Sequence, residues 1–331
     1  MIHAAILVLE QCHASSAGGF ADILQVANAH LRRQQGADAV QFGWRFVAFS
    51  DRPVTASNGL QLQVHKLEPG ERYDLVFIPG LHYEGRARFD RLLERQAEAC
   101  AWLAAQWRAG AWIAANCTGT FVLAQTGLLD GRTATTTWWL ERQFRARYPE
   151  VALQLRSVIT ESERMVCAGA SASYLLQAIR VVERFAGPAV AAQTARSLLI
   201  DVSQTSQVPY LPLLAERTHA DSLVLRAQHW LQRNMARELR ISELAAALAV
   251  SDRTLIRRFK AALEQAPLAY LQDLRLEAAR RLLETGDQSL DAIAGQVGYT
   301  DTSSFSRLFR QRIGMSPGAY RNRFRVDLTS G

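Results

Sequence analysis

The last third of the chain contains one helical pattern twice, and this repeat constrains the fold more than any other feature. A shift of 50 residues aligns Leu255 with Phe305, Phe259 with Phe309, Pro267 with Pro317 and Tyr270 with Tyr320. Upstream of the turn the shift is 49 residues and aligns Ile241 with Leu290, Leu244 with Ile293, Ala245 with Ala294 and Leu248 with Val297. Each copy therefore predicts a short helix, a tight turn and a second helix, between Ile241 and Arg321.

The apolar residues of each copy recur at helical spacing, which predicts one buried stripe per helix. Leu255, Phe259, Phe305 and Phe309 are expected in the core. Ser251 or Asp252 is expected to cap the second helix of the first copy, and Asp301 that of the second copy. Polar and basic side chains lie on the outer faces of these second helices, as entry into a DNA groove requires: Arg253, Arg257, Arg258 and Lys260, then Ser303, Ser304, Ser306, Arg307 and Arg310.

The run from Val297 to Arg310, with Gly314-Met315-Ser316-Pro317 and Tyr320-Arg321, resembles the signature of AraC-type DNA-binding domains. The resemblance covers roughly the last third of the chain. It implies double-stranded DNA and RNA polymerase as partners, and dimerisation through the N-terminal part. It also implies base contacts by these residues: Arg253, Thr254 and Arg257, then Thr302, Ser303 and Arg307.

Charge is distributed as DNA binding requires. Residues 217–331 contain 18 Arg and Lys against 12 Asp and Glu, whereas residues 1–216 contain 20 against 19. The excess of positive charge therefore lies with the repeat, where phosphate contacts are expected. The segment from Pro267 to Glu284 predicts a helix of about 27 Å between the copies. One chain could then enter two successive major-groove segments.

Composition excludes several classes of protein. No apolar run reaches the roughly 18 residues of a membrane helix, and the N-terminus lacks a signal-peptide pattern, so a cytoplasmic protein without membrane contact is expected. The four cysteines and seven histidines show no metal-ligand spacing, and we expect no metal, cofactor or disulfide framework.

The first 200 residues predict a different architecture. Buried strands are expected at 4–9, 73–78 and 111–116, a long helix at about 88–109, and a strand at 151–160. Strands that alternate with helices predict a parallel sheet between helical layers, that is, an α/β sandwich. The expected domains are a ligand-sensing domain at 1–202, a linker at 203–220, and an all-α double helix-turn-helix domain at 221–325.

Cys117 follows a predicted strand and begins a sharp turn into a helix. Such an elbow is expected to expose the thiol and to lower its pKa through the helix dipole and backbone N–H groups. The segments 116–124 and 127–136 resemble the PfpI/ThiJ branch of the class I glutamine amidotransferase-like fold, over about residues 1–200. Followed by the AraC-type region, the whole chain resembles the GlxA-type AraC regulators.

Enzymes of that fold pair the cysteine with a carboxylate and often a histidine. At the positions where such enzymes carry the carboxylate or the histidine, this chain has Ser15 to Gly18, Thr118 and Thr137. None of these residues can act as a general base. We therefore predict a catalytically inactive sensor of a small metabolite, with amino acids, betaines and other small nitrogen compounds as first candidates. The alternative is a Cys117-dependent amidase or hydratase-like enzyme. The predicted pocket residues are Ser15, Ser16, Gly80, Leu81, His82, Cys117, Thr118, Thr137, Trp138 and Gly169.

Overall fold

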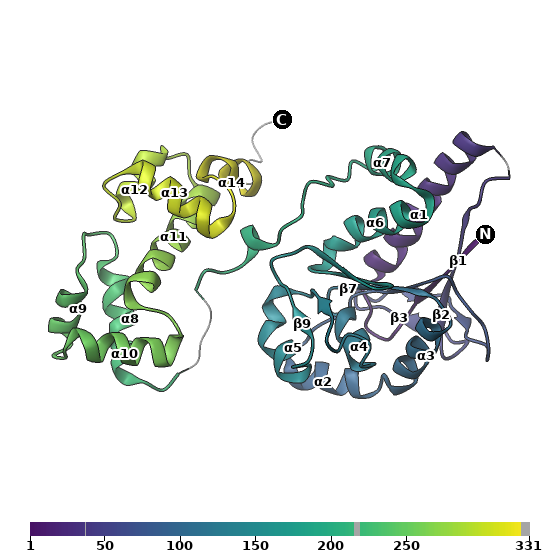
Figure 1. Ribbon diagram of the computed structural model, residues 1–331, viewed down its shortest axis with the longest axis horizontal. Coiled ribbons are helices and arrows are strands. Elements are labelled where there is room, and N and C mark those ends of the chain that lie inside the picture. Colours follow the sequence, from purple (N-terminus) through teal and green to yellow (C-terminus); the bar gives the residue numbers. More distant parts are fainter. Residues whose placement is uncertain (37, 215–218, 326–331) are drawn as a thin grey trace. The chain divides into compact units, whose positions relative to one another are not determined.

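The computed structural model describes residues 1–36, 38–214 and 219–325 of the chain (Figure 1). Contacts divide the chain into two compact units, Met1–Gln207 and Val208–Gly331. The segment predicted as a linker is shared between them: residues 203–207 belong to the first unit and 208–214 to the second. Residues 215–218 of that segment lie outside the described part of the chain.

The first unit is built on a seven-stranded sheet with the strand order β10-β11-β7-β6-β1-β2-β5. All neighbouring strands are parallel except β10 and β11, which are antiparallel. The strands of this sheet are β1 (Ile2–Leu7), β2 (Phe42–Ala48), β5 (His65–Lys66), β6 (Leu75–Ile78), β7 (Trp112–Asn116), β10 (Ile159–Ser162) and β11 (Met165–Ala168). Two small sheets pair β3 (Val54–Thr55) with β4 (Gln61–Leu62), and β8 (Thr133–Ala134) with β9 (Ala152–Leu153).

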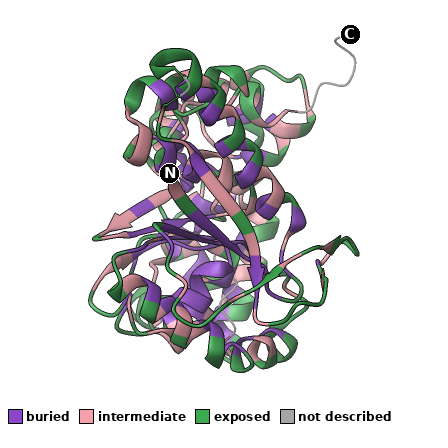
Figure 2. Cartoon of the chain, turned by 90° about the vertical axis from the view of Figure 1, so that its right-hand side faces the viewer, coloured by how far each residue is buried: buried purple, intermediate pink, exposed green. Residues whose placement is uncertain are grey.

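Helices cover both faces of the sheet, as predicted for an α/β sandwich. One face carries α1 (Ala14–Gln35), α6 (Tyr174–Ala186) and α7 (Pro188–Ser197). The other carries α2 (Arg86–Glu94), α3 (Ala97–Arg108), α4 (Gly119–Gln125) and α5 (Glu141–Arg147). Because strand side chains alternate, Ala5 and Leu7 pack in one core and Ala4 and Ile6 in the other. The central strands are thus buried on both faces (purple in Figure 2).

Two predicted elements are wrong in extent. The long helix expected at 88–109 is interrupted at Gln96, whose side-chain amide donates to the Leu92 carbonyl and which starts α3 as a separate helix. The strand expected at 151–160 is two strands, β9 and β10. Between them the Arg156 carbonyl accepts a hydrogen bond from the backbone N–H of Gln207, so this stretch pairs with the end of the unit instead of continuing β9.

The second unit consists of helices within its described residues. They are η3 (Val208–Tyr210), α8 (Ser222–Asn234), α9 (Ile241–Ala247), α10 (Asp252–Leu263), α11 (Pro267–Thr285), α12 (Leu290–Gln296), α13 (Thr302–Ile313) and α14 (Pro317–Phe324). Helices α9 and α10 form the first predicted helix-turn-helix, and α12 and α13 the second. The remaining short helices of the chain, η1 (Trp138–Leu140) and η2 (Ser171–Ser173), precede α5 and α6 in the first unit.

Helix α11 joins two separate hydrophobic cores. Its first half contributes Tyr270, Leu271 and Leu274 to the core of α8 to α10, and its second half contributes Leu276, Ala279 and Leu283 to that of α12 to α14. The four residues expected in these cores, Leu255, Phe259, Phe305 and Phe309, are completely buried. Each helix-turn-helix therefore has its own core and presents its outer face to solvent.

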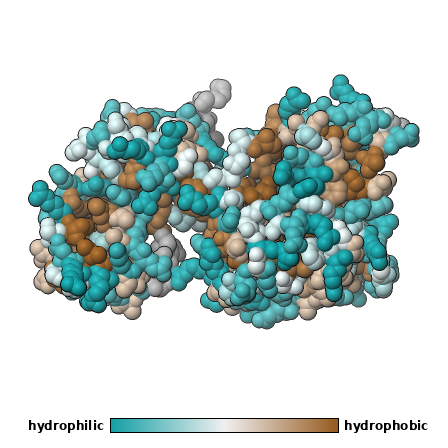
Figure 3. All heavy atoms as spheres, in the orientation of Figure 1, coloured by the Kyte–Doolittle hydropathy of each residue, from teal (hydrophilic) through white to brown (hydrophobic). Residues whose placement is uncertain are grey.

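Hydrophilic residues cover most of the visible face of each unit (Figure 3). Within the described residues, no helix is both long and apolar enough to cross a membrane.

Candidate functional site

The first recognition helix, α10, is fixed at its start by Ser251, whose hydroxyl accepts from the backbone N–H of Thr254. Arg253 and Arg257 are exposed, and neither forms an ion pair with any described residue. Arg258 is different, because its guanidinium donates two hydrogen bonds to Asp221, the N-cap of α8. Arg258 thus joins α10 to α8, and Arg253 and Arg257 remain free to contact DNA.

The second recognition helix, α13, begins at Asp301, which accepts from the backbone N–H groups of Ser303 and Ser304. The Ser304 hydroxyl, and then these two backbone N–H groups, lower the pKa of the Asp301 carboxyl by hydrogen bonding to it. The Thr302 hydroxyl donates to Asp291 of α12 at 2.6 Å. Arg307 is exposed and lies 3.5 Å from the Ser304 hydroxyl. Of the predicted contact residues in the second copy, Ser303 and Arg307 are the two whose exposed side chains remain available for DNA.

The turns of the two copies each contain a residue with a positive φ at the aligned position. Ala249 and Gly298 both have a positive φ, 55° and 88°. A Cβ on Gly298 would lie 2.5 Å from the Met235 carbonyl oxygen, so glycine is required there by contact as well as by conformation. The helices that follow also end alike, with Glu264 and Gly314 in the left-handed region.

Cys117 lies at the predicted elbow, with a φ of 54° between β7 and α4. The expectation that the elbow exposes its thiol and lowers its pKa is wrong. Cys117 is 1% exposed. Burial raises the pKa of the thiol to about 11, and hydrogen bonds from Thr118 and Thr137 lower it by less. The thiol is therefore protonated and enclosed at neutral pH.

Several predicted pocket residues form the buried layer around this thiol. The Thr118 hydroxyl exchanges two hydrogen bonds of 2.6 Å with the backbone of Leu81, and both residues are buried. The Thr137 hydroxyl is buried and, apart from its interaction with Cys117, has no hydrogen-bond partner among the described residues. Gly169 packs against the side chain of Gln207, which takes up all the space beside it.

A histidine that the sequence analysis did not consider, His13, lies next to this elbow. A Cβ placed on Gly80 would be 3.0 Å from His13 Nδ1 and 3.4 Å from the Cys117 Cβ, so the two side chains flank Gly80. His13 Nδ1 also lies 3.3 Å from the Ser171 hydroxyl. Burial, and then the nearby His82, lowers the pKa of His13, which favours neutral imidazole. The available signal was its position in the loop between the first strand and the first helix, where His13 is the N-cap residue of α1.

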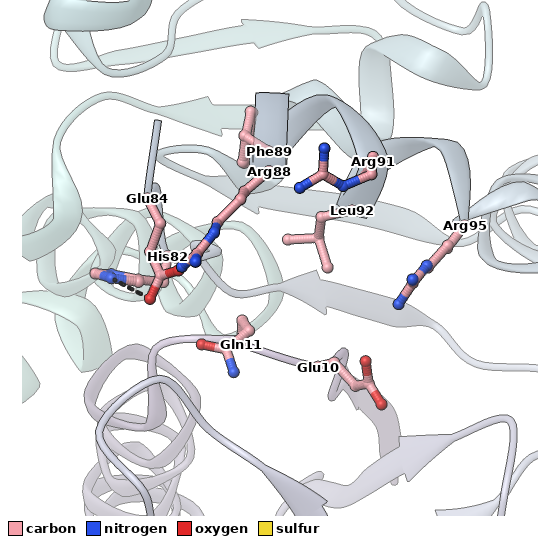
Figure 4. Close-up of a pocket in the computed structure, with 9 residues that line it drawn as sticks. All are labelled: Glu10, Gln11, His82, Glu84, Arg88, Phe89, Arg91, Leu92 and Arg95. Carbon is pink, nitrogen blue, oxygen red and sulfur yellow. Dashed lines mark hydrogen bonds and ion pairs between the residues drawn. The ribbon is translucent and has the colours of Figure 1, made fainter. Parts of the chain in front are cut away.

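The remaining predicted pocket residues differ in exposure and contacts. Ser16 is buried and donates to the His13 carbonyl, whereas Ser15 is exposed. Trp138 is half-buried and stacks edge-on against Trp139. His82 is exposed and lines a hollow that opens beside α2 (Figure 4). In the part of the chain that the structure describes, no group of three His, Cys, Asp or Glu side chains could hold a metal ion.

Known proteins resemble both units. The DJ-1/PfpI family matches residues 22–178, and a helix-turn-helix domain family matches residues 244–323. The transcriptional regulator CdhR of Pseudomonas aeruginosa is 29% identical over 83% of this chain and 80% of its own length. GbdR and ArgR, regulators of the same organism, are 26% and 30% identical over 83% and 66% of this chain, and over 74% and 66% of their own lengths.

Solved structures match the first unit at the level of fold. Drosophila melanogaster DJ-1beta is 17% identical with a TM-score of 0.50, covering 60% of this chain and 98% of its own. A Vibrio parahaemolyticus protein described as a transcriptional regulator is 19% identical with a TM-score of 0.51, at the same coverage. With both domains matched in this order, the chain belongs to the AraC-type transcriptional regulators that carry a DJ-1/PfpI domain ahead of the helix-turn-helix domain.

Proposed function

We propose that this protein regulates transcription by inserting α10 and α13 into successive major-groove segments of double-stranded DNA. The observation that carries the proposal is the pair of exposed arginines Arg253 and Arg257, which project from a capped helix and have no ion-pair partner in the described chain. Arginine reads guanine through two parallel hydrogen bonds, and it also neutralises phosphate. Arg307 and Ser303 supply the corresponding contacts from the second copy.

The spacing of the two helix-turn-helix units supports this binding mode. Helix α11, which joins their cores, has 19 residues and is about 28 Å long. One turn of DNA is about 34 Å, so the two copies match adjacent groove segments on one side of the duplex. Helix α10 carries three exposed basic side chains without an ion pair among the described residues, Arg253, Arg257 and Lys260, against Arg307 and Arg310 on α13. The first copy therefore contributes more of the affinity.

We further propose that a small metabolite binds to the DJ-1/PfpI domain and alters DNA binding. Side chains reach solvent at the carboxyl edge of the parallel sheet, where ligands bind in open α/β folds. Among the predicted pocket residues, Ser15 and His82 are exposed and Trp138 is half-buried, whereas Cys117 and Thr118 are buried. The three accessible side chains are the ones we expect to meet the ligand first. Amino acids, betaines and related nitrogen compounds are the first candidates. The active form is a cytoplasmic homodimer that contacts RNA polymerase.

Gln207 provides a route between the two sites. It is the last residue of the first unit and is 3% exposed. Its amide nitrogen lies 3.1 Å from the Thr135 hydroxyl and 3.0 Å from the Ser157 carbonyl. The neighbouring Thr136 hydroxyl donates to the Cys117 carbonyl at 2.7 Å. A ligand that moves the Cys117 loop therefore acts on the residue from which the DNA-binding unit continues.

The competing function is covalent catalysis by Cys117, and the proximity of His13 is the observation that favours it. We propose that catalysis does not occur, because a buried thiol with a pKa of about 11 contributes almost no thiolate at pH 7. Mass spectrometry after incubation with candidate amides separates the two functions. A Cys117 adduct that forms and turns over would support the enzyme.

The domain assignment is tested by ending the chain after Gln207. This fragment retains the complete sheet and the Gln207 contacts, so it is expected to fold cooperatively and to lose all DNA binding. Operator binding by the fragment, measured by electrophoretic mobility shift, would contradict the assignment of DNA contacts to α10 and α13.

A further inference from the structure

A charged hollow lies at the end of the sheet where strands β1 and β6 finish. It measures about 290 Å³ and is lined by Glu10, Gln11, His82, Glu84, Arg88, Phe89, Arg91, Leu92 and Arg95. Figure 4 shows the loop after β1 facing helix α2 across this hollow. Its volume is close to the lower limit of small-molecule sites, which begin at about 300 Å³.

The basic residues of the hollow come from α2 and its end: Arg88 and Arg91 lie on the helix, and Arg95 is its C-cap residue. Arg88, Arg91 and Arg95 are three and four residues apart, so their side chains follow one stripe along the helix. Arg88 is paired with Glu84. Arg91 and Arg95 are exposed and form no ion pair within the described residues. Like charges four residues apart destabilise a helix, and here no described carboxylate neutralises them.

The one arginine of α2 that does not line the hollow, Arg86, is paired. Arg86 forms an ion pair with Asp90 at 3.6 Å, and Asp90 is also paired with Arg147 of α5 at 3.4 Å. The two guanidinium groups that have no ion pair among the described residues, those of Arg91 and Arg95, thus both line the hollow. Their arrangement leaves a place for an external anion.

We propose that this hollow binds a small molecule through a carboxylate or phosphate group held by Arg91 and Arg95. The guanidinium fork matches both oxyanions, since each accepts two parallel hydrogen bonds. Phe89 and Leu92 supply an apolar wall for the carbon skeleton. Glu10, a free carboxylate on the opposite side, selects ligands that carry a hydroxyl or amino donor beside the oxyanion. This inference specifies the chemistry of the proposed effector and rests on the DJ-1/PfpI domain being the sensor.

The test is calorimetric titration of the full chain with three probes: L-malate, L-glutamate and glycerol 3-phosphate. Succinamide, which is uncharged, serves as the neutral control. We expect saturable binding of at least one oxyanion and none of succinamide, and the probe that binds separates carboxylate from phosphate. R91Q and R95Q should each weaken binding about tenfold or more, because each removes a charge-assisted contact. R86Q, which removes a paired arginine outside the hollow, should leave the affinity unchanged.

Absence of binding by all three probes would overturn the inference, as would equal affinity of wild type, R91Q and R95Q. DNA affinity of the same ligand-free proteins is measured in parallel. If wild type fails to bind DNA but binds an oxyanion through Arg91 and Arg95, the regulatory function fails and the anion site stands. If DNA binding is intact and no probe binds, the anion site fails alone.

Discussion

The side chain of Gln207 occupies the space that a Cβ on Gly169 would require. A Cβ built on Gly169 would lie 2.3 Å from Gln207 Oε1 and 2.4 Å from its Cδ. The glycine that follows β11 thus leaves room for the side chain of the last residue of the first unit. Gln207 Oε1 is buried without a hydrogen-bond partner in the described structure. The side chain is therefore held by the hydrogen bonds of its amide nitrogen and by packing against Gly169.

This contact predicts that Gly169→Ala destabilises the N-terminal domain. The new methyl group must displace a buried side chain, and overpacking of this kind costs about 1–3 kcal/mol. Urea unfolding of the fragment ending at Gln207 measures the change. Gly18→Ala is the matched control: a Cβ there meets no atom within 4 Å, and alanine favours its helix. Equal stability of Gly169→Ala and wild type would show that Gln207 is not confined.

Arg257→Ala should weaken specific DNA binding by about 1–3 kcal/mol, as expected for loss of a bidentate base contact. Fluorescence anisotropy at fixed salt gives the affinities for operator and random DNA. Arg233→Ala removes an exposed arginine of α8, outside both helix-turn-helix units, and should leave the ratio of the two affinities unchanged. An unaltered operator curve for Arg257→Ala would remove this residue from the interface.

Arg258→Ala should lower the stability of the DNA-binding domain and should not remove a base contact. Its guanidinium holds the Asp221 carboxylate that caps α8, and this interaction keeps the pKa of Asp221 low. Removing it loosens α8 against α10 and lowers the melting temperature of the DNA-binding domain. The ratio of operator to random-DNA affinity should persist at temperatures where the variant is folded. If the preference for operator over random DNA were lost while the melting temperature stayed unchanged, Arg258 would be inferred to contact the bases directly.

The Cys117 thiol should react slowly with iodoacetamide. Its pKa of about 11, against an ordinary 9.0, reduces the thiolate fraction at pH 8 about 100-fold, and burial restricts access further. Peptide mapping after timed alkylation gives the rate, with urea-unfolded protein as the reference. Cys117 modification as fast in native as in unfolded protein would contradict the buried, protonated thiol.

The same protonation makes stability depend on pH in the alkaline range. The folded state retains the proton on Cys12 and Cys117 up to a pKa of about 11, whereas the unfolded thiols lose it near 9. The stabilising effect is therefore complete below pH 9 and is lost as pH rises towards 11. Urea midpoints of the domain ending at Gln207 should fall across this window, and by less in Cys117→Ala. A midpoint that stays constant from pH 8.5 to 10.5 would contradict the raised pKa values.

The features predicted correctly from the sequence are local ones. Helical spacing and a cap at Asp301 define α13 within a dozen residues, and the repeat identifies a second copy of the same unit. One failure is local: Gln96, whose side chain bonds to the Leu92 carbonyl of the preceding turn, interrupts the predicted helix. The others come from long-range contacts. Cys117 is buried in part by the Thr136–Thr137 segment and Gly80. Gln207 looked like part of a polar linker, because nothing near it in sequence indicates the space beside Gly169.

Selection of double-stranded DNA from a random pool by the full chain tests the central claim most directly. Two recognition helices on one α11 predict enrichment of a bipartite sequence whose two elements lie about 10 base pairs apart. Arg257→Ala should weaken the base preference of the selected sequences at one element, and Arg307→Ala should weaken it at the other. Recovery of no enriched sequence, or of a single element unaffected by either substitution, would contradict the account.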